Sequence, residues 1–139
     1  MKKATIGYTP RFRPSPVSAW VHVPTGPVPA WRDAGAYSPP LPGPVGGRGW
    51  PVLDVEVDGV ALTFSSLAEL DHVIDVLSRN PLPTTRQLSA ARGNGAGPNG
   101  HWLSRLPAKA KPARFRAVLV ARLRRARDAY AAVARVAKA

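Results

Sequence analysis

The stretch "VLDVEVDGVALTFSSLAELDHVIDVLSRN", Val52 to Asn80, decides the fold that this chain can adopt. Its first part alternates apolar and acidic residues from Leu53 to Val57, which is the period of a strand with one buried face. Asp58-Gly59 then supplies the two residues of a tight hairpin turn. The alternation resumes beyond the turn as far as Phe64, so the sequence predicts a β-hairpin.

The turn sets the register of this hairpin. It pairs Val57 with Val60, Val55 with Leu62, and Leu53 with Phe64. All six apolar side chains then lie on one face of the hairpin. A slip of one residue would bring Asp54 and Glu56 onto that face, so the register is strongly specified.

A helix follows the hairpin directly. Ser66 and Glu69 have the spacing of a capping box, and Asn80-Pro81 is expected to end the helix. Its apolar stripe consists of Leu67, Leu70, Val73, Ile74 and Leu77. We expect this stripe to pack on the apolar face of the hairpin, in a ββα unit. Asp71 and Asp75 are interpreted as a solvated helix face, or as partners for the basic C-terminal helix, rather than as a metal or acid-base pair.

Residues 1–51 are predicted to form an extended arm, because they hold 11 of the 16 prolines. Residues 17–23, "VSAWVHV", are the one segment expected to form a short strand. The arm is rich in aromatic residues, unlike most disordered segments. We expect it to dock on the protein's own core, on a second copy or on another protein, with Trp20, Trp31, Tyr37 and Trp50 as its anchors. The segment "SPPLPGP", residues 38–44, also fits the pattern of ligands for aromatic-lined grooves.

Residues 113–139 are predicted to form a long basic amphipathic helix after Pro112. Phe115, Leu119, Leu123, Ala126, Tyr130, Val133 and Ala137 recur every three or four residues. This stripe is expected to pack in the core, with dimerisation through it as the alternative. Only Asp128 interrupts the basic residues of the helix, so an external polyanion is a reasonable partner.

The composition bounds the class of protein. The 139 residues suffice for one small domain, which we place at 52–139. The formal net charge of +12 is segregated, because residues 51–80 are net acidic and residues 81–139 are strongly basic. Such a distribution is typical of a nucleic-acid partner, although an Arg-, Ala- and Pro-rich composition also arises from a GC-rich genome. There is no cysteine, no secretory signal pattern and no apolar run long enough for a membrane span, so we expect a cytoplasmic protein.

A glycine-rich stretch, "RGNGAGPNGHWLSRLPAKAKP", lies between the two halves of the basic region. It lacks both the Lys-Ser or Lys-Thr ending of a phosphate-binding loop and a preceding strand. It also lacks the strand and βαβ unit of a dinucleotide-binding fingerprint. Two interpretations remain: a turn between two short helices, or a joint packed by Trp102, Leu103 and Leu106.

The window from Leu82 to Leu106 resembles the helix-turn-helix segment of GntR-type winged repressors. The residues that match the opening of that segment are Leu82, Pro83, Thr84, Arg86 and Leu88. Gly93, Leu103 and Leu106 fall where the family has its turn glycine and recognition-helix leucines. The resemblance implies a first helix capped by Thr84, a second helix opened by Pro98, and DNA contacts from Asn99, His101, Ser104 and Arg105. The positions that read bases in the family hold Gly95, Ala96 and Gly97, so contacts with the phosphate backbone would dominate.

We therefore predict a small α+β protein: an extended arm, a ββα unit, a short helical glycine-rich segment and a long basic helix. The expected function is non-enzymatic binding of DNA or RNA, without cofactor or metal. The residues predicted to contact nucleic acid are Arg86, Arg92, Asn99, His101, Arg105, Lys109, Lys111, Arg114, Arg116, Arg124 and Arg127. The alternative is a protein–protein adaptor or inhibitor, or a self-associating protein, that docks through the aromatic arm.

Overall fold

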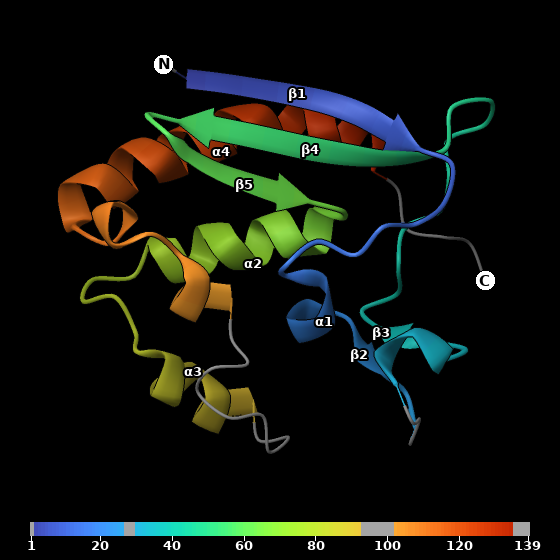
Figure 1. The fold of residues 1–139 in the computed structure, drawn as a ribbon, viewed down its shortest axis with the longest axis horizontal. Helices are drawn as coiled ribbons and strands as arrows, with labels where there is room; N and C mark the ends of the chain where they lie inside the picture. The colour runs from blue at the N-terminus through green and yellow to red at the C-terminus, as the bar shows by residue number, and fades with distance from the viewer. Residues whose placement is uncertain (1, 27–29, 93–101, 135–139) are drawn as a thin grey trace.

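The predicted hairpin forms the centre and one edge of a three-stranded antiparallel sheet (Figure 1). This arrangement is seen in a computed structural model, which describes residues 2–26, 30–92 and 102–134. Strands β4 (Trp50–Val57) and β5 (Val60–Phe64) pair in the predicted register. The turn places Asp58 at φ 49° and Gly59 at φ 88°, which are the two positive φ angles that a tight two-residue hairpin turn requires.

The third strand of the sheet comes from the arm. Strand β1 (Lys2–Thr9) pairs antiparallel with β4 along its whole length, so the sheet order is β1-β4-β5. Ala4 and Ile6 lie opposite Val55 and Leu53 and face the core with them. The segment expected to be an extended arm, with no strand before residue 17, therefore begins as part of the sheet.

Helices cover one face of this sheet. Helix α4 (Ala113–Val133) packs against β4 and β1, helix α2 (Leu67–Leu77) packs against β5, and the two helices also pack on each other (Figure 1). The buried residues at this junction include Leu53, Val55, Phe64, Leu70, Val73, Leu77, Leu119, Leu123 and Tyr130. The predicted stripes of both helices are thus confirmed over the described residues, with Leu62 and Ile74 at the margin of the core, half-buried.

The first turn of α2 differs in detail from a capping box. The Ser66 hydroxyl accepts the Glu69 backbone N–H, as predicted for an N-cap. The Glu69 side chain does not return to the Ser66 backbone. It accepts the Ser65 N–H instead, because its carboxylate is drawn toward the arm.

The rest of the arm folds back onto α2. The predicted strand at residues 17–23 is wrong: Ser18–Val21 form the short helix α1, and Val23–Pro24 form strand β2. Strand β2 pairs with β3 (Tyr37–Ser38), and the 3-10 helix η1 (Trp31–Asp33) lies between them in sequence. Val17 and Trp20 are buried in the core. The arm is therefore docked on its own protein.

The region between α2 and α4 is only partly as expected. Helix α3 (Thr85–Arg92) forms, and Thr84 and Gln87 exchange the two hydrogen bonds of a capping box. The second helix expected from Pro98 to Leu106 is, over the described residues, the four-residue 3-10 helix η3 (Trp102–Arg105). Trp102, Leu103 and Leu106 are buried, as the packed-joint interpretation predicts. A further 3-10 helix, η4 (Ala108–Ala110), leads into α4.

Candidate nucleic-acid interface and a buried polar cluster

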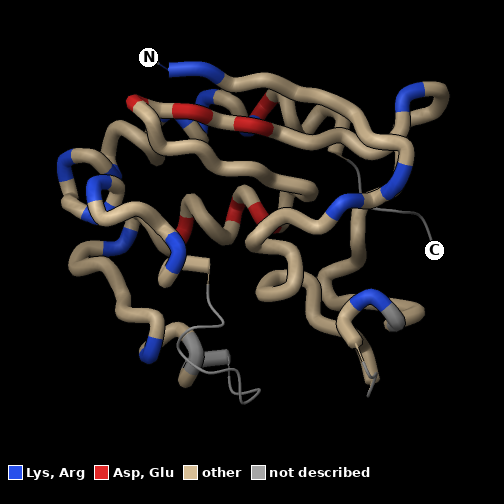
Figure 2. Tube along the Cα trace, in the orientation of Figure 1, with Lys and Arg blue, Asp and Glu red and all other residues tan. Residues whose placement is uncertain are grey.

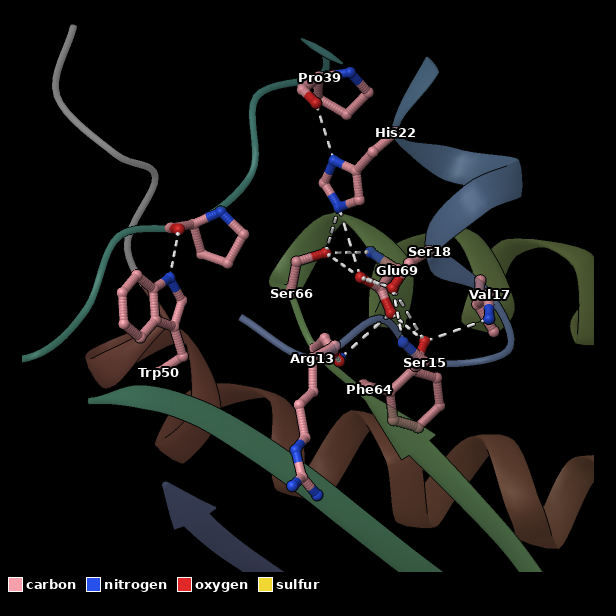
Figure 3. Close-up of polar contacts among 12 residues, drawn as sticks. Arg13, Ser15, Val17, Ser18, His22, Pro39, Trp50, Phe64, Ser66 and Glu69 are labelled. Atoms are coloured by element: carbon pink, nitrogen blue, oxygen red, sulfur yellow. Dashed lines mark hydrogen bonds and ion pairs between the residues drawn. The ribbon is translucent and has the colours of Figure 1, made fainter. Parts of the chain in front are cut away.

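Six polar residues are buried together where the arm meets the start of α2. This buried cluster consists of Ser15, Ser18, His22, Ser65, Ser66 and Glu69 (Figure 3). The first three belong to the arm and the last three to the segment that opens α2. The cluster is the point at which a polar network ties the arm to the ββα unit.

Glu69 lies at the centre of the buried cluster. One carboxylate oxygen accepts the Ser15 hydroxyl and the Ser65 N–H, and the other accepts the hydroxyls of Ser18 at 2.9 Å and Ser66 at 3.0 Å. Burial alone would raise the pKa of Glu69. The hydrogen bonds from His22, Ser15, Ser65 and Ser18 outweigh burial, so the pKa lies below its usual value and the carboxylate is charged.

His22 completes the cluster with both of its ring nitrogens. Nδ1 lies 2.7 Å from the carbonyl oxygen of Pro39, and Nε2 lies 2.7 Å from the Ser66 hydroxyl and 3.4 Å from a Glu69 oxygen. A carbonyl accepts only, so Nδ1 carries a proton. Nε2 contacts both Ser66 and Glu69, and the side chains of His22 and Glu69 are fully buried.

The cluster contains serine, histidine and glutamate but lacks the geometry of a catalytic triad. In a triad, the acid holds one imidazole nitrogen and the nucleophile contacts the other. Here Ser66 and Glu69 share Nε2, and a backbone carbonyl occupies Nδ1. His22 and Glu69 have no exposed surface for a substrate to reach. The arrangement supports a structural role, which is to fasten the arm.

The predicted anchors of the arm are also engaged within the chain. Trp20 is buried in the core, and the Trp31 indole N–H donates to the His22 carbonyl at 2.7 Å. The Tyr37 hydroxyl donates to the Trp31 carbonyl, and the two rings are 4.8 Å apart. Trp50 donates to the Pro42 carbonyl, within the proline-rich segment. Of these four, Trp31, Tyr37 and Trp50 are half-buried, and their edges remain accessible.

Several exposed basic residues lie at the end of the molecule where η4 lies and α4 begins, and others are spread over β1, the arm and α3 (Figure 2). Arg86, Arg105, Lys109, Lys111, Arg114 and Arg124 are all exposed. Lys109 donates to the Asp58 carbonyl at the hairpin turn, and Arg124 contacts the Ser78 hydroxyl at 3.3 Å. Among the described ion pairs, none involves any of these six residues.

Arg116 does not belong to this surface. The sequence analysis placed it among the nucleic-acid contacts, but its exposed fraction is only 5%. Its guanidinium donates to the carbonyls of Lys111, Leu77 and Arg79 and to the side chain of Asn80. The carbonyls of Leu77 and Arg79 and the Asn80 side chain lie at or just beyond the end of α2, where the last carbonyls lack helical partners. Arg116 therefore caps α2, and its charge complements the negative end of that helix.

Arg127 is only partly available. Its guanidinium makes a bidentate contact with the Asp71 carboxylate, at 2.6 and 3.0 Å, and the two side chains are 40% and 45% exposed. Asp75 pairs instead with Arg79, four residues on and just beyond the end of α2. The predicted pairing with the C-terminal helix is thus confirmed for Asp71 alone, and Asp75 lies on the exposed face of α2.

Three of the predicted contacts lie where the structure gives no side-chain position. Asn99 and His101 are outside the described residues, and the Arg92 side chain is not described. Among the described residues, no group of three or more His, Asp or Glu side chains could hold a metal ion. Within the same residues, no helix is both long and apolar enough to cross a membrane.

Sequence reasoning missed the buried cluster and the cap formed by Arg116. One local pattern pointed to the former, since Ser15, Ser18 and His22 recur at helical spacing among apolar residues. No protein-family model, curated protein or solved structure matches this chain. The similarity of residues 82–106 to the repressor family therefore stays a prediction.

Proposed function

We propose that this protein binds DNA or RNA through the phosphate backbone, with the basic end of the molecule as its contact surface. The observation that carries the proposal is the exposed run Arg105, Lys109, Lys111 and Arg114, which is continuous from η3 to the start of α4 and is extended by Arg124. Because these side chains have no carboxylate partner among the described ion pairs, they are available to phosphate oxygens.

Binding of this kind has little sequence preference. The run lies on two 3-10 helices and the first half of α4, and the described part of the predicted recognition helix has Trp102 and Leu103 buried. Phosphate contacts position a nucleic acid without reading its bases. Five basic contacts predict a slope of about −4 to −5 for the logarithm of the association constant against the logarithm of salt concentration on duplex DNA.

The test is a salt titration with labelled duplex DNA and single-stranded RNA. Replacing Lys111, Arg114 and Arg124 with Gln removes three contacts and should reduce the magnitude of the DNA slope by about 2 to 3. The matched control replaces Arg11, Arg13 and Arg32 with Gln, which removes the same charge from exposed positions on the arm. The control should lower affinity only slightly.

Two results would contradict the proposal. One is an absence of binding to either nucleic acid at low salt, where nonspecific contacts are strongest. The other is an equal loss of slope in both triple variants, because the attraction would then reflect the net charge and not this surface.

A further inference from the structure

Strand β5 is an edge strand whose outer side is unprotected. The hairpin turn makes Val57 and Val60 a hydrogen-bonded pair, so Val60, Leu62 and Phe64 direct their backbone groups to β4. The backbone groups of Ala61 and Thr63 then point away from the sheet. Within the described residues, no hydrogen bond engages them on that side.

The two edges of the sheet differ in this respect. Strand β1 begins with Lys2 and Lys3, and lysines on an edge discourage pairing with another strand. Strand β5 has the sequence "VALTF", which contains no charge and no proline. Its five residues are short for a strand but sufficient for pairing with an added peptide.

A cleft runs beside this edge, with a volume of about 190 Å³. Its lining is mainly apolar and includes Val73 from α2 and Trp102 and Leu106 from the η3 region. All three of these residues are buried. The cleft suits a large apolar side chain and is smaller than a typical small-molecule site of 300 to about 1,000 Å³.

The charge beside the cleft selects the kind of segment. Arg105 is the only charged side chain among the described residues that line it. At the start of β5, Lys109 lies against the turn, where its Nζ is 2.7 Å from the Asp58 carbonyl. On the side of the cleft, a strand laid along β5 would therefore meet Arg105, which favours an acidic residue beside its apolar ones. The acidic Asp54 and Glu56 lie opposite Thr63 and Ala61, on the other face of the sheet.

We propose that β5 and this cleft bind an extended, acidic segment of a partner protein by β-strand addition. The backbone of the segment pairs with Ala61 and Thr63, one apolar side chain enters the cleft, and a carboxylate meets Arg105. This surface shares Arg105 and Lys109 with the nucleic-acid surface but includes none of the residues varied in the nucleic-acid test, so either proposal can fail without the other.

The probe is a fluorescent end-blocked peptide, Glu-Leu-Thr-Leu-Thr-Glu, with a twin that carries Lys at both ends. The acidic peptide should bind more tightly. Arg105→Gln should remove most of this preference, and Arg125→Gln, an exposed arginine of α4 outside the cleft, should leave it unchanged. Equal effects of these two variants would overturn the proposal, because general attraction to a basic protein would explain them.

Backbone pairing is tested from both sides. N-methylation removes backbone N–H donors from the peptide, and two modified peptides are compared, one methylated at both threonines and one at both leucines. One of them should bind about tenfold more weakly, as two lost hydrogen bonds predict, and the other should bind as before. If the threonines are the sensitive pair, the added strand is antiparallel to β5.

Ala61→Pro removes an outward N–H at an edge position that tolerates proline, and should abolish binding with little change in the thermal melt. If neither N-methylated peptide binds more weakly, the proposal is overturned. It is also overturned if the protein self-associates and Ala61→Pro converts it to a monomer, because a second copy would then occupy the edge.

Discussion

The protein uses charge in opposite ways in two regions. Where the arm meets α2, Glu69 and His22 are fully buried and every polar atom has a defined partner. At the start of α4, Lys111 and Arg114 are exposed and take part in none of the described ion pairs. Composition alone therefore does not assign a role to a charge. Buried charges here determine which segments stay together, and exposed charges remain available for a partner.

The comparison predicts the largest loss of stability at the buried cluster. Glu69→Gln removes the negative charge and leaves His22 and the donors around it without a charged acceptor. Each buried donor left without its acceptor costs about 1–3 kcal/mol, so we expect a total loss of about 3–5 kcal/mol. Urea unfolding should show this loss, and Glu56→Gln on the exposed face of β4 should change the free energy of unfolding little. Equal stabilities for these two variants would show that the cluster does not fasten the arm.

The second prediction concerns Arg116, an arginine of α4 that is buried and hydrogen-bonded like the residues of the buried cluster. Arg116→Met keeps much of the side-chain volume but leaves the carbonyls of Leu77 and Arg79 without their donor. Hydrogen bonds to a charged group contribute about 1.5–3 kcal/mol each, and part of this loss is recovered by water, so we expect a cost of about 2–3 kcal/mol. The control is Arg114→Met, two positions earlier and exposed, which should have little effect on stability. If Arg114→Met is the more destabilising variant, the assignment of Arg116 as the cap of α2 is wrong.

The buried cluster and Arg116 also show which features could not be predicted from the sequence. The hairpin register, the Ser66 cap and the helical stripes were predictable because each depends on residues close together in the chain. The buried cluster joins Glu69 to Ser15 and Ser18, more than 50 residues away, and no local pattern specifies that contact. The charge of Arg116 looked like that of its neighbours on the helix, and only the position of α2 sets it apart.

The strand β1 was missed for a related reason. Its apolar positions, Ala4, Ile6 and Tyr8, alternate as in a strand, but small and polar residues separate them and prolines follow closely. The pattern gains meaning only when β4 offers an edge for pairing. Conversely, the segment at 17–23 has high strand propensity, yet Ser18 and His22 must face Glu69 together, which a helical turn allows.

The stability that Glu69 contributes should also depend on pH. The folded-state pKa of Glu69 is lowered, because hydrogen bonds to its carboxylate outweigh burial. Its contribution is therefore fully present above the unfolded-state value and is lost as the pH falls through the lower, folded-state value. The free energy difference between wild type and Glu69→Gln should shrink below about pH 4. Urea unfolding at several pH values measures this, with Glu56→Gln as the control. A difference that is constant from neutral pH into that acid range would mean that the Glu69 charge is not what stabilises the cluster.

The smallest effect is expected for the ion pair between Asp71 and Arg127, which lies between the two extremes. It joins α2 to α4 with good bidentate geometry, and the hydrogen bond to Asp71 raises the pKa of Arg127 above its usual value. Both side chains are nevertheless about half exposed, so water and salt screen the attraction. A double-mutant cycle with Asp71→Asn and Arg127→Gln should give a coupling near the limit of measurement, and added salt should abolish it. A large coupling that salt does not weaken would place this pair with the buried cluster, and Arg127 would then join Arg116 as a structural charge of α4.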